Sequence, residues 1–86
     1  MSDADPDPAL NAPDVVVDAL GRLCPLPIID LARRIGEVPV DGTVELLADD
    51  PAAAADVAAW CRLRGQQLLG TRDLPTGQAY LIRRTH

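Results

Sequence analysis

The segment GRLCPLP, residues 21–27, joins two stretches of different character. Before it, residues 15–19 (VVVDA) are rich in β-branched side chains, which is typical of a strand. After it, apolar residues recur every three or four positions, which predicts the buried face of a helix over residues 25–35. Pro25 suits the first helical position, because an N–H there would have no partner within the helix. The sequence therefore places Cys24 at the junction of a strand and a helix.

Cys24 is the residue with the clearest chemistry. Unpaired N–H groups and the dipole at a helix N-terminus favour negative charge. The N–H groups of Leu26 and Ile28 are expected to stabilise the sulfur anion, and Arg22 adds positive charge nearby. We predict a partly exposed thiol with a pKa below the ordinary value of about 8.5. The alternative is a buried turn cysteine that acts as a small hydrophobic residue.

The rest of the chain predicts one more helix and three more strands. Residues 43–48 (TVELLA) favour a second strand, and DDP at 49–51 resembles a helix start, with the helix ending near Gly65. Residues 66–73 and 78–84 favour a pair of strands joined by a short link. Right-handed crossovers place both helices on one face of the sheet. We predict an α/β two-layer sandwich, β-α-β-α-β-β, with a four-stranded mixed sheet.

Length and charge limit the possible functions. The 86 residues suffice for one domain, which we place at 14–86, after an acidic, proline-rich tail at 1–13 that is expected to be disordered. The formal net charge of −5 offers no basic surface for direct nucleic-acid binding. No apolar run approaches the roughly 20 residues that span a membrane. Two cysteines make no disulfide framework, so a cytoplasmic location is expected.

The sequence lacks the partners that most cysteine chemistry requires. Cys24 and Cys61 are 37 positions apart and the single histidine is His86, so neither a metal site nor a Cys/His hydrolase is expected. Pro27 occupies the position where a redox C-x-x-C pair would need its second cysteine. No cofactor is predicted. A nucleophile without an acid or base suits a carrier of sulfur better than a turnover enzyme.

Several short motifs together resemble those of one family. DALG (18–21) before CPLP (24–27), then ADDP (48–51) and YLIR (80–83), are similar to the TusA (SirA-like) sulfur-carrier family with its C-P-x-P motif. The resemblance implies the same two-layer sandwich and a persulfide on Cys24. It also implies a cysteine desulfurase or similar donor and a sulfur-acceptor protein as partners. Family routes include tRNA 2-thiolation, molybdenum-cofactor synthesis and sulfur oxidation.

The other candidate site residues fall into two groups. The first group surrounds Cys24 and is expected to support its chemistry. In this group Leu26 is expected to point outward and to lie on the surface that partner proteins cover. Its members are Arg22, Pro25, Leu26 and Pro27. The second group holds possible partner contacts, each with a simpler reading as a solvated charge, a helix cap or an aromatic at the rim of the core. Its members are Arg33, Arg34, Asp49, Asp50 and Trp60.

Two other functions remain open for the same fold. An exposed cysteine of low pKa also oxidises to sulfenic acid, so a thiol redox sensor is one alternative. The other is a non-catalytic interaction module whose thiol has no role. The apolar face of the second predicted helix carries Ala54, Val57, Ala58 and Cys61. Cys61 is therefore expected to be a buried structural thiol.

Overall fold

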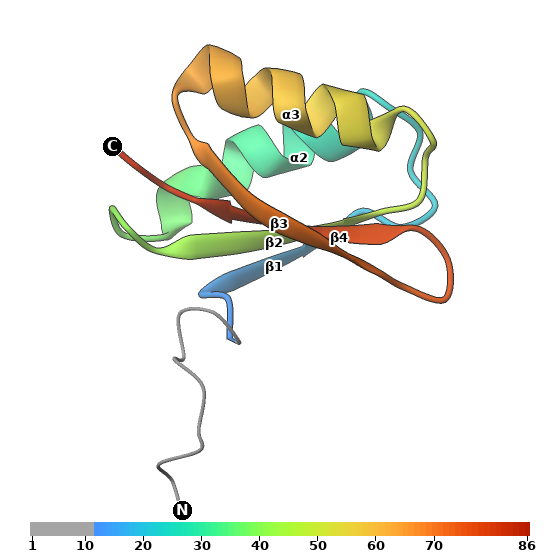
Figure 1. Cartoon of the computed structure of the whole chain (residues 1–86), viewed down its shortest axis with the longest axis horizontal. Helices are drawn as coiled ribbons and strands as arrows, with labels where there is room; N and C mark the ends of the chain where they lie inside the picture. The colour runs from blue at the N-terminus through green and yellow to red at the C-terminus, as the bar shows by residue number, and fades with distance from the viewer. Residues whose placement is uncertain (1–11) are drawn as a thin grey trace, which may run out of the picture.

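A computed structural model describes residues 12–86, and its elements follow the predicted order β-α-β-α-β-β (Figure 1). The predicted tail at 1–13 falls almost entirely outside the described residues and stays a prediction. A single 3-10 turn, η2 (Ile35–Glu37), extends the first helix. The remaining elements are β1 (Val15–Asp18), α2 (Leu26–Arg34), β2 (Thr43–Ala48), α3 (Ala53–Arg64), β3 (Gln67–Asp73) and β4 (Gln78–Arg83).

The four strands form one mixed sheet in the order β1-β2-β4-β3. β1 runs parallel to β2, whereas β4 is antiparallel to both β2 and β3. Helices α2 and α3 lie side by side over one face of this sheet (Figure 1). The predicted two-layer α/β sandwich is therefore confirmed.

The core lies between the sheet and the two helices and is almost entirely aliphatic. Alternate residues of β2 point into it, because successive side chains of a strand face opposite sides. α2 contributes Leu31, which is fully buried, and β4 contributes Ile82. The largest fully buried side chains are Leu31, Leu46, Ile82, Val38, Val44, Val57 and Pro27.

The inward face of α3 differs from the one predicted. The sequence pattern centred that face on Ala54, Val57, Ala58 and Cys61, but Ala54 is exposed and Ala58 is only half-buried. Turning the helix toward Trp60 buries a large indole in place of two methyl groups, which removes more apolar area from water. The buried residues of α3 are Ala53, Val57, Trp60 and Cys61.

The parallel pairing of β1 and β2 brings two distant segments together. The C-terminal ends of parallel strands meet at the same edge, and Asp18 lies opposite Leu47. The loop that carries Cys24 therefore lies beside the segment that follows β2. Gly77, in the β3–β4 turn, packs against the same edge with φ +84°, and a Cβ there would overlap the Ala48 carbonyl oxygen. The site is thus assembled where β1, β2 and the hairpin meet.

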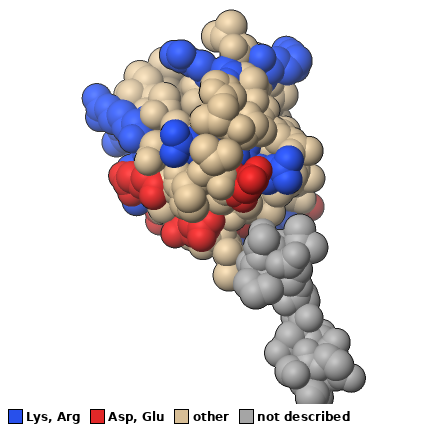
Figure 2. All heavy atoms as spheres, turned by 90° about the vertical axis from the view of Figure 1, so that its left-hand side faces the viewer, with Lys and Arg blue, Asp and Glu red and all other residues tan. Residues whose placement is uncertain are grey.

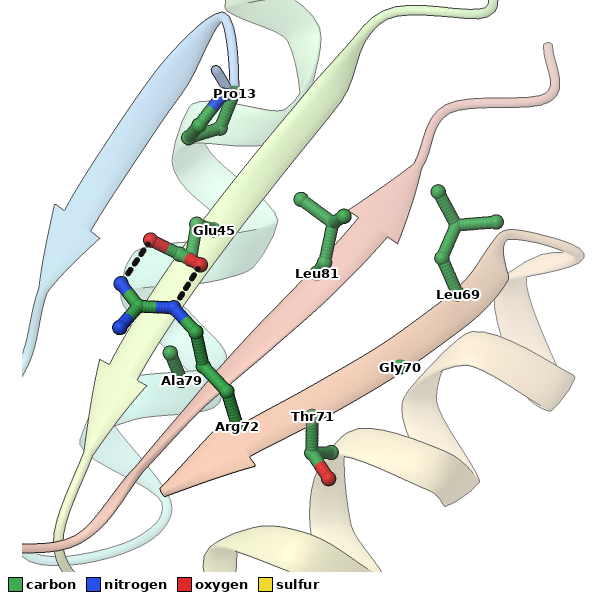
Figure 3. A pocket seen from close by; sticks show the side chains of 8 residues that line it. All are labelled: Pro13, Glu45, Leu69, Gly70, Thr71, Arg72, Ala79 and Leu81. Atoms are coloured by element: carbon green, nitrogen blue, oxygen red, sulfur yellow. Dashed lines mark hydrogen bonds and ion pairs between the residues drawn. The ribbon is translucent and has the colours of Figure 1, made fainter. Parts of the chain in front are cut away.

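The opposite face of the sheet carries no helix within the described residues and has a shallow hollow of about 370 Å³ (Figure 3). Arg72 of β3 reaches across β4 to Glu45 of β2, with Nε and Nη2 each donating to one carboxylate oxygen at 3.1 Å. Ala79 and Leu81 line its apolar part. Cys24 does not line this hollow, so the thiol and the hollow are separate features.

The two ends of the helical layer differ in charge. Arg33 and Arg34 lie in the last turn of α2, and Arg62 and Arg64 in the last turn of α3, where the helix dipole favours cations. Figure 2 views the molecule from this end and shows basic side chains spread over it. Cys24 lies at the other end, just before α2 begins. Neither helix in the described part of the chain has the length and apolar character to cross a membrane.

Replacing Leu46 by alanine should test the core. Leu46 is fully buried in β2, so Leu46→Ala should lower the free energy of unfolding by about 2–5 kcal/mol. Leu63→Ala is the control, because that side chain is 82% exposed and should change stability by less than about 0.5 kcal/mol. Urea denaturation followed by circular dichroism measures both. If both variants lost the same free energy of unfolding, the assignment of Leu46 to the core would be contradicted.

Candidate functional site

Cys24 lies in a tight loop between β1 and α2. Ala19 N donates to Leu47 O at 2.9 Å as the last bond to the sheet, and the chain then turns through Gly21, which has φ +80°. The Cys24–Pro25 peptide bond is cis. The Cys24 side chain is half-buried and packs against the edge of the core. The sulfur is thus at the surface but partly covered, which agrees with the prediction of a partly exposed thiol.

Asp49 and Asp50 hold this loop from the neighbouring segment. Both carboxylate oxygens of Asp49 accept from Gly21 N, at 3.0 and 3.1 Å. Asp50 Oδ2 accepts from Cys24 N at 3.1 Å, while its Oδ1 accepts from Ala52 N at 2.8 Å. The N-cap of α3 is Ala52, which has no side-chain bond, so the expectation that Asp50 caps this helix was wrong. The bonds from both aspartates across to the cysteine loop were not predicted.

The backbone N–H groups at the start of α2 do not support a thiolate. Leu26 N donates to Leu23 O at 2.9 Å, and Ile28 N donates to Pro25 O at 3.0 Å. The prolines have no N–H, and Cys24 N is taken by Asp50. The helix begins at Leu26, with Pro25 as its N-cap, so Cys24 precedes the capping position. The N–H groups expected to stabilise the anion are already in use.

The prediction of a readily ionised Cys24 was wrong. Partial burial, a hydrogen bond to the Asp56 side chain, and the negative charges of Asp50 and Asp56 raise the pKa of Cys24 to about 11. Each of these disfavours a second negative charge at the sulfur. The N–H groups of Ala52 and Cys24 lower the pKa of Asp50, so its carboxylate is ionised at neutral pH. At pH 7 Cys24 is therefore a neutral thiol.

The positive charge that Arg22 was expected to add beside the sulfur is paired with a carboxylate. Arg22 Nε is 2.8 Å from Asp30 Oδ2, so its charge is paired on the surface of α2. Arg34 pairs with Glu37 at 2.7 Å, beyond the end of α2. Arg33 is in the same last turn, about 10 Å along the helix from Leu26 at 1.5 Å per residue. Arg33 and Arg34 thus lie at the end of α2 away from Cys24, in agreement with their simpler reading as solvated charges.

An apolar rim surrounds the cysteine loop. It comprises Leu20, Leu23, Leu26 and Ile29, with exposed fractions between 38% and 72%. Leu26 points outward as predicted, whereas Pro27, in the first turn of α2, is buried. Leu23, the most exposed, was not singled out from the sequence, although a leucine in a Gly/Pro turn could have been noticed. Exposed apolar side chains gathered around one group are typical of a surface that another protein covers.

Trp60 does not belong to that surface. Its side chain is only 9% exposed and is part of the core cluster. The low exposure agrees with the simpler reading of Trp60 as an aromatic at the rim of the core, because the indole takes the place of the alanines on the inward face of α3. Cys61, in the next position, is 3% exposed, which confirms the predicted buried thiol.

Two residues near the sulfur were missed from the sequence. Asp56, half-buried in the first turn of α3, is one of the carboxyl groups that raise the pKa of the Cys24 thiol, after its partial burial. Tyr80 of β4 is buried, its hydroxyl donates to Gln78 Oε1 at 3.2 Å, and burial and the nearby Cys24 raise its pKa. From the sequence, Asp56 is an ordinary acidic residue in a first helical turn. Its contact with Cys24 depends on how α3 packs, which no local pattern records.

These features define a small thiol-bearing protein whose one accessible cysteine lies at the edge of a two-layer sandwich. The model of the TusA sulfurtransferase family matches residues 15–84, so the chain belongs to that family. Among solved structures, a SirA-like protein from Desulfitobacterium hafniense superposes with a TM-score of 0.66 at 23% identity, covering 80% of this chain and 93% of that one. It has the same fold. Membership of the family supports a role as a sulfur carrier that works with partner proteins.

The raised pKa of Cys24 can be checked by alkylation. In a Cys61→Ala variant, which leaves one thiol, the rate of reaction with iodoacetamide should keep rising with pH and level off near about 11. The reason is that only the thiolate reacts. Partial burial and the two carboxylates raise the pH at which the thiolate forms. A free cysteine peptide, levelling near about 8.5, is the control. Circular dichroism checks that the fold persists, and a plateau below pH 9 would contradict the assignment.

Proposed function

We propose that this protein carries sulfane sulfur as a persulfide on Cys24 in the cytoplasm. It receives the sulfur from a cysteine desulfurase or a similar donor and passes it to an acceptor protein of tRNA 2-thiolation, molybdenum-cofactor synthesis or sulfur oxidation. The observation that carries this proposal is the contrast between the two thiols. Cys24 is half-exposed within the apolar rim, whereas Cys61 is 3% exposed in the core.

The proposed chemistry is an exchange of one S–S bond for another. Cys24 attacks the outer sulfur of the donor's persulfide, the donor's S–S bond breaks, and the donor cysteine leaves as a thiolate. The product is Cys24–S–SH, whose outer sulfur an acceptor thiolate then removes in the same way. Docking through the apolar rim would align these atoms, since such exchange requires the attacking sulfur to reach the S–S bond.

The redox-sensor alternative is less well supported by this geometry. Sensor cysteines have a low pKa, because the thiolate reacts with peroxide. Partial burial and the carboxylates of Asp56 and Asp50 raise the pKa of Cys24 instead, and no N–H group of the α2 first turn is free to offset them. A neutral thiol that reacts only when a partner docks is better suited to directed transfer.

Intact-mass spectrometry tests the function. After incubation with a cysteine desulfurase and cysteine, the protein should gain the mass of one sulfur atom, and a reductant should remove it. Cys24→Ser should abolish the gain, whereas Cys61→Ala should retain it, because only Cys24 is accessible. Oxygen adducts under mild peroxide without any sulfur gain would instead favour the sensor, and no adduct of either kind would favour a non-catalytic module.

The apolar rim can be tested with one charge. Leu26→Asp should slow sulfur loading by a protein donor at least about tenfold, because a buried unpaired carboxylate would oppose docking. Leu26 is 40% exposed, so the fold should tolerate the change. Leu63→Asp, at an 82% exposed position on α3, is the matched control and should load normally. If Leu26→Asp accepts sulfur as fast as the unchanged protein, the apolar rim is not part of the docking surface.

A further inference from the structure

The face of the sheet away from the helices, which we call the open face, carries apolar side chains that the described part of the chain leaves uncovered. Val16 of β1 and Leu69 of β3 are 48% and 38% exposed, and Leu81 of β4 is half-buried. Leu69 and Leu81 line the hollow of about 370 Å³ on this face (Figure 3). Apolar side chains gathered on one face indicate a surface that another segment or molecule covers.

Two buried polar atoms on the open face have no hydrogen-bond partner among residues 12–86. Thr43 of β2 and Arg83 of β4 lie opposite each other in the sheet. Their neighbours Val44 and Ile82 point into the core, so these two side chains lie on the open face. Thr43 is 2% exposed with Oγ1 unpaired, and the Nε of Arg83 is likewise buried and unpaired. A buried polar group without a partner is destabilising, so an acceptor from outside these residues would be favoured at this position.

The N-terminal segment joins the domain beside these two atoms. Asp14 N donates to Thr43 O, and Asp14 Oδ2 accepts from Thr43 N, both at 2.9 Å. Pro13, one residue earlier, already lines the hollow (Figure 3). Residues 1–11, which lie outside the described part of the chain, are therefore attached at the rim of the open face.

The length of this segment is sufficient to cross the open face. Four strands spaced about 4.8 Å apart form a sheet about 14 Å across. An extended chain advances about 3.3 Å per residue, so residues 1–11 can cover about 36 Å. Leu10 is three residues before Pro13 and can reach about 10 Å beyond it, which is about the width of two strand spacings. The apolar part of the hollow, formed by Leu69 and Leu81, is therefore within its reach.

The charges of the segment and of the open face are also complementary. Residues 1–11 contain three aspartates and no lysine or arginine. On the open face, Arg72 is paired with Glu45, but none of the ion pairs among residues 12–86 involves Arg83. Attachment through Pro13 makes the encounter intramolecular, so even a weak attraction favours contact.

We propose that residues 1–11 lie across the open face, with the Leu10 side chain in the hollow and acceptor oxygens of the segment on Arg83 and Thr43. The composition of the segment predicts no helix or strand of its own, so the sheet supplies the apolar contact that fixes it. This differs from the expectation of a disordered tail, which considered the segment without the sheet. Cys24 does not line the hollow, so the thiol stays accessible whether or not the segment is docked.

Nuclear magnetic resonance of the full chain tests the contact directly. Nuclear Overhauser effects should join the methyl groups of Leu10 to those of Leu69 or Leu81. Their intensity relative to effects within the core should not change with protein concentration, because the contact is within one molecule. If Leu10 shows no such effect, or contacts residues of α2 or α3 instead, the proposal is overturned.

Leu10→Ser provides a second test, because it removes the apolar group that would fill the hollow. The ratio of docked to free segment should fall by about tenfold, since one leucine side chain is no longer buried. The methyl signals of Leu69 and Leu81 should then shift and broaden more strongly with a soluble nitroxide. Ala4→Ser is the control from the same segment and should leave these signals unchanged. Both changes lie outside residues 12–86, so circular dichroism should show the same fold for both variants.

The other possible occupants of the open face give different results. A dimer by light scattering, with nuclear Overhauser effects between differently labelled molecules at Leu69 and Leu81, would assign the face to a second copy and overturn the proposal. Identical spectra at the hollow for Leu10→Ser and Ala4→Ser would also overturn it. A monomer in which only Leu10→Ser alters the hollow is the result that supports the proposal.

Discussion

The site depends on one carboxylate that binds two backbone N–H groups from different parts of the fold. Asp50 accepts from Cys24 N, in the loop after β1, and from Ala52 N, just before α3. A hydrogen bond to a charged group contributes more than one between neutral groups, typically about 1.5–3 kcal/mol. With Asp49 on Gly21, these bonds fix the cysteine loop against the second half of the chain. The position of the sulfur relative to α3 follows from them.

The same carboxylate that positions the cysteine also opposes its ionisation. Helix N-termini commonly activate thiols through free N–H groups, but here Pro25 and Pro27 carry none and the others are taken. Partial burial, followed by the carboxylates of Asp56 and Asp50, therefore raises the pKa of Cys24. On the proposed function, a thiol that stays neutral until a partner arrives reacts little with other electrophiles in the cell.

The fold could be predicted from the sequence because its signals are local. Alternating or β-branched runs, the two helix starts at Pro25 and Pro51, and Gly65 after α3 each mark an element independently. The chemistry of the site could not, because it depends on contacts between segments far apart in the chain. Leu23 O takes the N–H group expected to face the sulfur, and Asp56 reaches Cys24 only through the packing of α3. The pattern placed Trp60 at the edge of the apolar face of α3, and only the packing of the helix turns it further inward than Ala54 and Ala58.

The burial of Cys61 has a consequence for how long a sulfur cargo would survive. A persulfide next to a second free thiol is discharged within the molecule, because that thiol attacks the inner sulfur, closes a disulfide and releases hydrogen sulfide. Cys61 is 3% exposed in the core, whereas Cys24 lies at the edge of that core, so the packing of the core encloses the second thiol. On the proposed function, loosening of the core around Cys61 would therefore shorten the lifetime of a sulfur cargo on Cys24.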